Sequence, residues 1–169
     1  METTTQKLSY LLYWTIIFIV SGSMFIYGIM KPIQFQDFAN STSNNLSEGH
    51  KLMWSFYSYT KAYPIIIGIL EVFGAITILF YRTRLFGCLL LSTILVNIII
   101  QDYLYEILAL NAAIFYLILI LYIIVFDIEK VKNIISVLFK PGKNRNSLFL
   151  IVIALIIAII IKFFETRIL

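Results

Sequence analysis

Five long apolar segments, separated by shorter polar ones, dominate the pattern of the chain. They cover residues 8–30, 64–81, 85–100, 107–126 and 148–164. Apolar and polar residues do not alternate within them, as they would in the strands of a transmembrane barrel. A helix needs about 20 largely apolar residues to cross a bilayer, and the second, third and fifth segments lie near the short limit. The pattern predicts an all-α integral membrane helical bundle, with a four-helix core and a fifth, C-terminal transmembrane helix.

The composition indicates a lipid environment. Of the 169 residues, 61% are hydrophobic and 13% are charged, and the mean hydropathy is +0.94. A soluble domain of this size has too little interior to hide so much apolar surface. We therefore expect one compact bundle in the membrane and no separate soluble domain.

The order of the segments divides the chain into three predicted regions. Residues 1–126 form the four-span core, with an outer loop at 31–63 whose polar stretch 40–45 we expect to be flexible. Residues 127–147 form a basic, amphipathic cytoplasmic linker. Residues 148–169 form the extra transmembrane helix.

Within the linker, apolar residues recur at helical spacing among lysines. This spacing predicts a short amphipathic helix on the cytoplasmic headgroups, ended by the Pro-Gly pair at 141–142. The apolar positions are Ile128, Val131, Ile134, Ile135 and Leu138.

The positions of the basic residues predict the orientation in the membrane. A cytoplasmic N-terminus places Lys7, the turn 82–84 and the linker inside, and places the acidic turn with Asp102 and Glu106 outside. Lysine and arginine favour the cytoplasmic side. We expect a multi-pass protein of the cell membrane, the cytoplasmic membrane in a bacterium. The excess of 13 Lys+Arg over 9 Asp+Glu then meets anionic lipid, so the predicted partner is the bilayer and not nucleic acid.

Counting residues excludes several cofactor sites. Cys88 is the single cysteine and His50 the single histidine, the latter expected to be a solvated residue of the outer loop. An intramolecular disulfide, a Cys-x-x-Cys redox pair, bis-histidine haem, di-iron carboxylate and zinc protease sites all need more such residues. We expect no metal site and no intrinsic cofactor.

Glu71 is the residue that most suggests a site, because a carboxylate inside a span is costly unless it is paired or protonated. A stripe of small residues on its helix turns it toward the bundle. Four further polar residues are predicted at a similar depth, which gives a candidate intramembrane cluster of Lys31, Glu71, Asn97, Gln101 and Asn111. Glu71 could bond Asn97, pair with Lys31 or keep its proton. The cluster could hold a quinone headgroup, a proton or a small solute, or serve only as a structural clamp between helices.

Two short motifs resemble DoxX-like membrane proteins. The segment Phe-Ile-Tyr-Gly-Ile-Met-Lys at 25–31, followed by Phe35 and Asp-Phe-Ala at 37–39, resembles their Gly-x-x-Lys…Phe-Ala segment. The segment Gly-Ile-Leu-Glu-Val-Phe-Gly at 68–74 resembles their Gly-x-x-Glu-x-x-Gly span. The similarity continues through 80–87 and covers residues 13–126.

The resemblance implies a four-helix membrane bundle, and some members are associated with quinol oxidase or sulfur-compound oxidation complexes. Lys31, Glu71 and Asn97 fall on motif positions of the family. This chain departs from the pattern in its fifth span and in Glu106, where an aspartate is common.

The leading functional hypothesis is an accessory, non-catalytic subunit linked to quinone or respiratory redox chemistry. Its candidate partners are membrane redox complex subunits, and quinone is a candidate ligand. One alternative is a small proton-coupled transporter that uses Glu71. The other is a membrane enzyme that acts on quinol or lipid. No catalytic residue is assigned.

Overall fold

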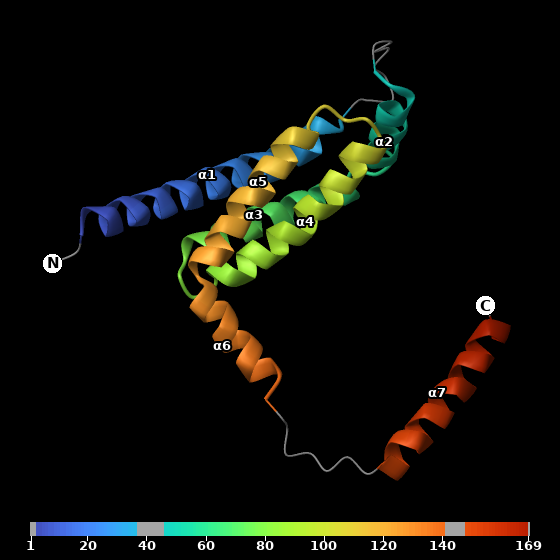
Figure 1. Cartoon of the computed structure of the whole chain (residues 1–169). Coiled ribbons are helices and arrows are strands. Elements are labelled where there is room, and N and C mark those ends of the chain that lie inside the picture. The colour runs from blue at the N-terminus through green and yellow to red at the C-terminus, as the bar shows by residue number, and fades with distance from the viewer. Residues whose placement is uncertain (1–2, 37–45, 141–147, 169) are drawn as a thin grey trace. The chain divides into compact units, whose positions relative to one another are not determined.

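The structure is a computed structural model that describes residues 3–36, 46–140 and 148–168. Seven helices and no strand are found in these ranges, which confirms the all-α fold (Figure 1). They are α1 (Thr4–Gln34), α2 (Glu48–Ser58), α3 (Ala62–Leu79), α4 (Arg84–Leu104), α5 (Leu110–Phe126), α6 (Ile128–Leu138) and α7 (Leu148–Ile168). The chain forms two compact units, Met1–Asn133 and Ile134–Leu169.

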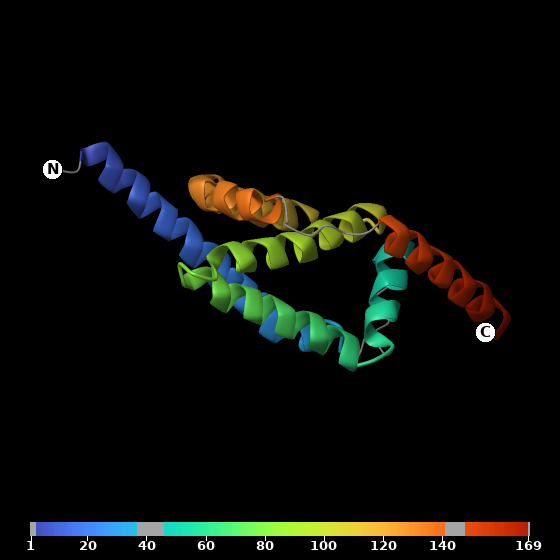
Figure 2. The same ribbon diagram turned by 90° about the horizontal axis from the view of Figure 1, so that it is seen from below.

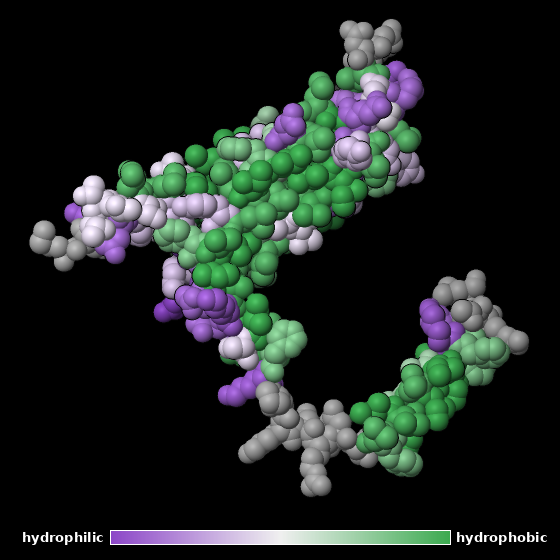
Figure 3. All heavy atoms as spheres, in the orientation of Figure 1, coloured by the Kyte–Doolittle hydropathy of each residue, from purple (hydrophilic) through white to green (hydrophobic). Residues whose placement is uncertain are grey.

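Four of the helices in the described part of the chain are long and apolar enough to cross a membrane: α1, α3, α4 and α7. The helix α5 meets the same test together with α6, from which it is bent by 75°. The protein is therefore a multi-pass membrane protein with four to five candidate spans. In Figure 3 hydrophobic residues cover the middle of the first unit, and hydrophilic ones gather at its two ends.

The first unit is a bundle in which α1 packs on α3, α3 on α4, α4 on α5, and α5 on α1 (Figure 2). The contact between α1 and α5 is the smallest of the four. Because dispersion forces and packing hold helices together in lipid, the buried side chains fix this arrangement. The fully buried apolar residues at its centre are Ile17, Val20, Ala75, Ile78, Cys88, Leu91, Ile120 and Ile123.

Glycines bring α1 and α3 into backbone contact. A Cβ atom added to Gly28 would lie 2.6 Å from the carbonyl oxygen of Gly68, and one added to Gly68 would overlap the carbonyl oxygen of Gly28. Only residues without a side chain permit this distance, as in other close helix crossings of membrane proteins.

A buried arginine, Arg84, lies at the end of the bundle remote from α2. Arg84 Nε donates to the carbonyl of Ile78 at 2.9 Å, and Nη1 donates to the hydroxyl of Tyr13 at 2.8 Å. Tyr13 in turn donates to Asp127 Oδ2 at 3.0 Å. The sequence analysis places Arg84 in the short turn between two spans, and its side chain there supplies donors to carbonyl groups at the end of α3 that have no partner within the helix.

The predicted outer loop contains a helix, α2, which the apolar pattern does not reveal. Ser47 begins it, since its hydroxyl accepts the backbone N–H of His50 at 3.2 Å, a common N-cap arrangement. His50 is therefore a helical residue rather than a loop residue, and its ring lies 4.1 Å from that of Trp54. The polar stretch 40–45 lies outside the described residues.

The helix α6 covers the segment for which the apolar spacing predicts an amphipathic helix. The pair 141–142, expected to end it, lies outside the described residues. In the second unit, α7 is apolar on all sides from residue 148 to 161, and its side chains from 148 to 165 are exposed. A helix of this kind is typical of a segment whose environment is lipid.

Candidate functional site

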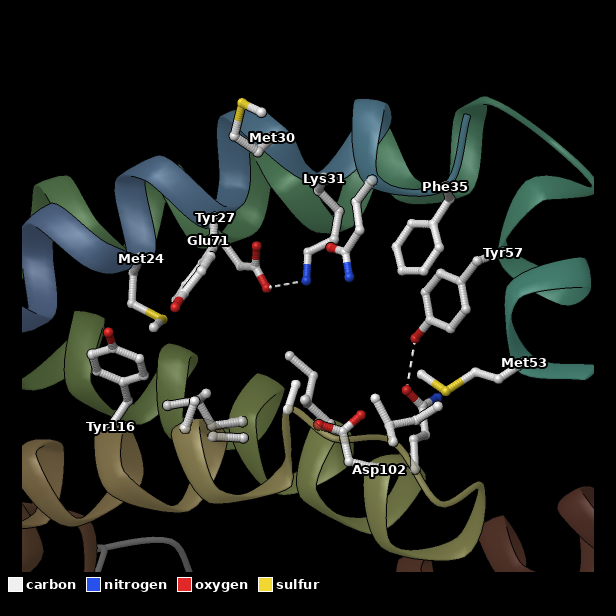
Figure 4. Close-up of a pocket in the computed structure, with 18 of the residues that line it drawn as sticks. Met24, Tyr27, Met30, Lys31, Phe35, Met53, Tyr57, Glu71, Asp102 and Tyr116 are labelled. Atoms are coloured by element: carbon white, nitrogen blue, oxygen red, sulfur yellow. Dashed lines mark hydrogen bonds and ion pairs between the residues drawn. The ribbon is translucent and has the colours of Figure 1, made fainter. Parts of the chain in front are cut away.

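A cavity of about 380 Å³ lies in the bundle at the end covered by α2 (Figure 4). All the helices of the first unit from α1 to α5 contribute to its wall. The principal lining residues are Met24, Tyr27, Met30, Lys31, Phe35, Met53, Trp54, Tyr57, Glu71, Leu95, Gln101, Asp102, Ala112 and Tyr116. The wall is thus largely apolar and aromatic, with a few polar groups.

Lys31 and Glu71 form a buried ion pair on this wall. Lys31 Nζ lies 2.7 Å from Glu71 Oε1, and the two side chains are 10% and 2% exposed. The other oxygen of Glu71, Oε2, is buried without a hydrogen-bond partner. Because an ion pair removed from water needs all its atoms satisfied to be favourable, this oxygen marks an incomplete site.

Asp102 lies on α4 and faces the ion pair across the cavity (Figure 4). Its side chain is buried, and Oδ2 has no hydrogen-bond partner. The chain turns sharply just after it, where Glu106 has a φ of 57° and the N–H of Ile107 donates to the carbonyl of Asp102 at 2.8 Å. This is the Schellman pattern of a helix end. The turn brings Ile107 back onto the cavity.

The charges in the cavity do not balance. Among the lining residues, Lys31 is the one base, while Glu71 and Asp102 are two acids. The pair of Lys31 and Glu71 is neutral, so Asp102 is the carboxyl group left over. A buried carboxylate is costly unless it gains a proton or a partner that donates hydrogen bonds.

The helix α2 covers the end of the cavity and is held there by aromatic and polar contacts. The rings of Phe35 and Tyr57 stack at 4.5 Å, and the Tyr57 hydroxyl donates to Gln101 Oε1 at 2.7 Å. Burial raises the pKa of Tyr57 to about 12, so the hydroxyl keeps the proton that it donates. A side chain on Gly49 would meet the backbone of Tyr105 at 2.9 Å, so α2 also rests closely on the end of α4.

Exposed lining residues indicate where the cavity opens. Ile26 and Met30 on α1 are 59% and 47% exposed, and Ala112 on α5 is also exposed. These residues flank the seam between α1 and α5, the smallest of the four contacts among α1, α3, α4 and α5. Next to this opening, Tyr27 and Tyr116 meet across the seam with ring centroids 5.8 Å apart.

The structure brings together three of the five predicted site residues. Lys31, Glu71 and Gln101 line the cavity, and of the three partners weighed for Glu71 the one observed is Lys31. Asn97 and Asn111 are exposed and do not line it. The reason is helix geometry, since each residue advances about 100° around the axis. Asn97 and Asn111 each lie two positions from a buried residue, Leu95 and Ala113, and so point to the opposite side.

Asp102 and Tyr57 are site residues that the sequence analysis did not assign to the cluster. A signal for Asp102 exists in the sequence, because it continues the spacing of buried residues Cys88, Leu91 and Leu95 along α4. Tyr57 carries no such signal, since its position depends on how α2 folds across the bundle.

The cavity and its surroundings belong to a chain with little similarity to known proteins. No family model and no solved structure matches it. It is 29% identical over 87 residues to the uncharacterized protein YwoB of Bacillus subtilis (strain 168). The similarity covers 50% of this chain and 56% of the relative, so the chain spans about half the length of the curated relative that it matches.

Proposed function

We propose that the protein is a DoxX-like, non-catalytic subunit of a membrane redox assembly, and that its cavity binds the head group of a lipid-soluble quinone. The observation that carries the proposal is the 380 Å³ cavity with a buried Lys31–Glu71 ion pair in its wall. A helix clamp without a ligand would be expected to fill this space with side chains, because protein interiors are closely packed.

The size and walls of the cavity suit a substituted aromatic or quinonoid ring. Ligand cavities usually have volumes of about 300–1,000 Å³, with apolar walls and a few polar groups that orient the ligand. The stacked rings of Phe35 and Tyr57 offer a flat surface to such a ring. Offset stacking of rings is favourable beyond the area it buries.

The polar groups suit the oxygen atoms of the same ligand. Lys31 donates one N–H to Glu71, and an ammonium group has three. A further N–H of Lys31 can therefore donate a hydrogen bond to a ligand oxygen. The oxygens Glu71 Oε2 and Asp102 Oδ2 can accept from a hydroxyl group, which the reduced form of such a ligand carries.

The opening at the seam between α1 and α5 supports a ligand that arrives through the bilayer. Its flanking residues Ile26, Met30 and Ala112 are apolar and exposed. In a membrane-spanning bundle such residues face hydrocarbon. A water-soluble solute would need a polar route instead.

The proposed orientation has the N-terminus in the cytoplasm. Lys7 and Lys130 then lie on the cytoplasmic side with the Arg84 end of the bundle, in accord with the preference of basic residues for that side. The cavity and α2 lie toward the outer face. Lys51→Cys and Lys130→Cys variants, labelled from outside in intact cells, test this orientation. Labelling at position 130 alone would show that the orientation is the opposite one.

Fluorescence of Trp54 tests the quinone site directly, because Trp54 lines the cavity. The chain has two tryptophans, so Trp14→Phe leaves Trp54 as the single reporter. A decyl-substituted benzoquinone added to this variant in lipid nanodiscs should quench Trp54 saturably. A matched variant with Trp54→Phe, which keeps Trp14, should show only the unsaturable quenching caused by quinone dissolved in lipid. Unsaturable quenching in both would overturn the quinone site.

Two further measurements separate the proposed role from its rivals. Isolation from native membranes should recover redox subunits together with the chain. Recovery of the chain alone, combined with proton-coupled solute uptake in liposomes that Glu71→Gln abolishes, would establish a transporter in place of the accessory subunit.

A further inference from the structure

The unpartnered oxygens of the cavity bear on which form of the ligand it holds. Resting on the proposed function, we infer that the cavity binds the reduced, dihydroxy form of the quinone in preference to the oxidised form, with Glu71 Oε2 and Asp102 Oδ2 as acceptors for its hydroxyl groups. This assigns Asp102 a role in ligand selection.

Of the three buried side-chain oxygens without a hydrogen-bond partner in the described residues, two belong to residues that line the cavity, Glu71 and Asp102. Both oxygens are buried without partners, in side chains that are 2% and 3% exposed. Buried polar atoms nearly always have a hydrogen-bond partner in folded proteins. Two such atoms belong to residues that line one cavity, and a ligand bound there can supply the missing donors.

The oxidised and reduced forms of the ligand differ in the hydrogen-bonding groups that they offer. A quinone has only carbonyl oxygens, which accept, and a carbonyl oxygen placed against a carboxylate oxygen leaves both without a donor. A quinol has two hydroxyl groups, each able to donate to a carboxylate. Lys31 can donate to an oxygen of either form, so it does not discriminate between them.

The protonation state of Asp102 determines which ligand oxygens it can bind. Since the Lys31–Glu71 pair is neutral, the carboxyl group of Asp102 is either ionised or neutral by protonation. A quinol hydroxyl both donates and accepts, so it satisfies Asp102 in either state. A quinone oxygen satisfies only the protonated state. The reduced form can thus form a hydrogen bond with Asp102 in both protonation states, whereas the oxidised form can do so only when Asp102 is protonated.

The size of the preference follows from one additional hydrogen bond to a charged group. Such a bond changes an affinity by about tenfold or more. For a two-electron couple a tenfold preference for the reduced form raises the midpoint potential of the bound ligand by about 30 mV. This preference requires binding alone and no electron transfer by the protein.

Displacement in anaerobic nanodiscs tests the preference. Trp54 in the Trp14→Phe protein is quenched with the decyl-substituted benzoquinone, and the corresponding quinol is then added. Half of the saturable quenching should be lost at a quinol-to-quinone ratio of about one to ten. Asp102→Asn should bring this ratio to one or above, because the amide N–H donates to the quinone carbonyl.

Controls make each result decisive. Glu106→Gln removes an exposed acid four positions further along the chain that does not line the cavity, and should keep the ratio of the parent. Saturable quenching of the Asp102→Asn protein by quinone verifies that this variant is folded.

The outcomes separate the two proposals. If the parent loses half of its saturable quenching only at a quinol-to-quinone ratio of one or more, the quinol preference is wrong. The proposed quinone site is unaffected by that result. A preference unchanged by both Asp102→Asn and Glu71→Gln overturns the assignment of the acceptor oxygens. The complete absence of saturable quenching overturns the site itself.

Discussion

Gly28 on α1 and Gly68 on α3 touch through their backbones, and each is followed three positions later by a member of the buried ion pair. The two helices run antiparallel (Figure 2). Helical side chains lean toward the N-terminus of their own helix. Lys31 therefore leans back toward Gly28, and Glu71 back toward Gly68, so that the two side chains meet at the level of the crossing. The glycine contact thus positions the charged pair.

Replacement of Gly68 by alanine should destabilise the bundle by about 1–3 kcal/mol, the usual cost of forcing additional atoms into a closely packed site. The new methyl group would overlap the carbonyl oxygen of Gly28, a backbone atom that cannot turn aside. Thermal unfolding of the purified protein in detergent, followed by circular dichroism, measures the change.

Gly22→Ala is the matched control, because it lies in the same helix as Gly28 and an added Cβ would meet nothing within 4 Å. It should be neutral or stabilising by up to about 1 kcal/mol, owing to the better helix propensity of alanine. Equal effects of the two substitutions would show that backbone contact does not position α1 and α3.

The ion pair itself makes a separate prediction. Lys31→Met leaves Glu71 charged and unpaired in the bundle, and should cost about 3–5 kcal/mol. The double variant with Glu71→Met removes both charges and should recover a large part of this loss, since a buried pair is often replaceable by apolar residues. A double-mutant cycle of unfolding free energies gives the coupling.

A coupling close to zero would contradict the pairing of Lys31 with Glu71. Lys51 and Glu48 provide a reference, because they pair at 2.8 Å on the exposed surface of α2. Their coupling should be below about 1 kcal/mol, as for other exposed pairs.

The spans of this protein could be predicted from sequence because lipid imposes a simple requirement. Each crossing segment must satisfy its own backbone and present apolar side chains, so hydropathy alone reveals it. Glu71 stands out for the same reason, since it is an acid within such a segment. The Gly-x-x-Lys and Gly-x-x-Glu motifs then place Lys31 beside it.

The remainder of the site depends on the rotation of each helix and on the path of the loop. Asn97 and Gln101 are four positions apart on α4, yet only Gln101 lines the cavity. The buried side of α4 carries Leu91 and Leu95. Asn97 lies on the exposed side of the helix, and hydropathy alone does not reveal to which side such a polar residue points. The helix α2 has 11 residues, too few to be recognised as a span, and its capping serine is a local feature within a polar loop.

Tyr57→Phe should loosen α2 without unfolding the bundle. The substitution removes the hydrogen bond to Gln101 Oε1 and keeps the ring that stacks on Phe35. The expected cost is about 1 kcal/mol, the net value of one such bond. Because the loss falls on α2, hydrogen exchange of its backbone amides should become several times faster while exchange in α3 stays unchanged.

Tyr59→Phe is the control for this change, because Tyr59 lies next to α2 and is 88% exposed. It removes the same hydroxyl group from a side chain in a solvent-accessible position and should leave exchange as in the parent. Equally fast exchange in both variants would mean that the contact of Tyr57 with Gln101 does not hold α2 in place.

The opening between α1 and α5 predicts the route of the proposed ligand. Ala112 is an exposed, small residue at this opening, on the wall of the cavity. A phenylalanine there would have to swing aside before a ring could pass. With Trp14→Phe as background, Ala112→Phe should slow the stopped-flow quenching of Trp54 by decyl benzoquinone by on the order of tenfold, which corresponds to a barrier increase of about 1.4 kcal/mol.

The control for this effect is Ile118→Phe, which adds a ring to an exposed position of α5 that does not line the cavity. Quenching of Trp54 in this variant should be as fast as in the Trp14→Phe background, because a larger side chain on the lipid-facing side does not obstruct the opening. Equal rates in all three proteins, with saturable quenching preserved, would place the entrance elsewhere. The end covered by α2 would then be the next candidate, and acceleration of quenching by Tyr57→Phe would identify it, since that variant releases the contact with Gln101.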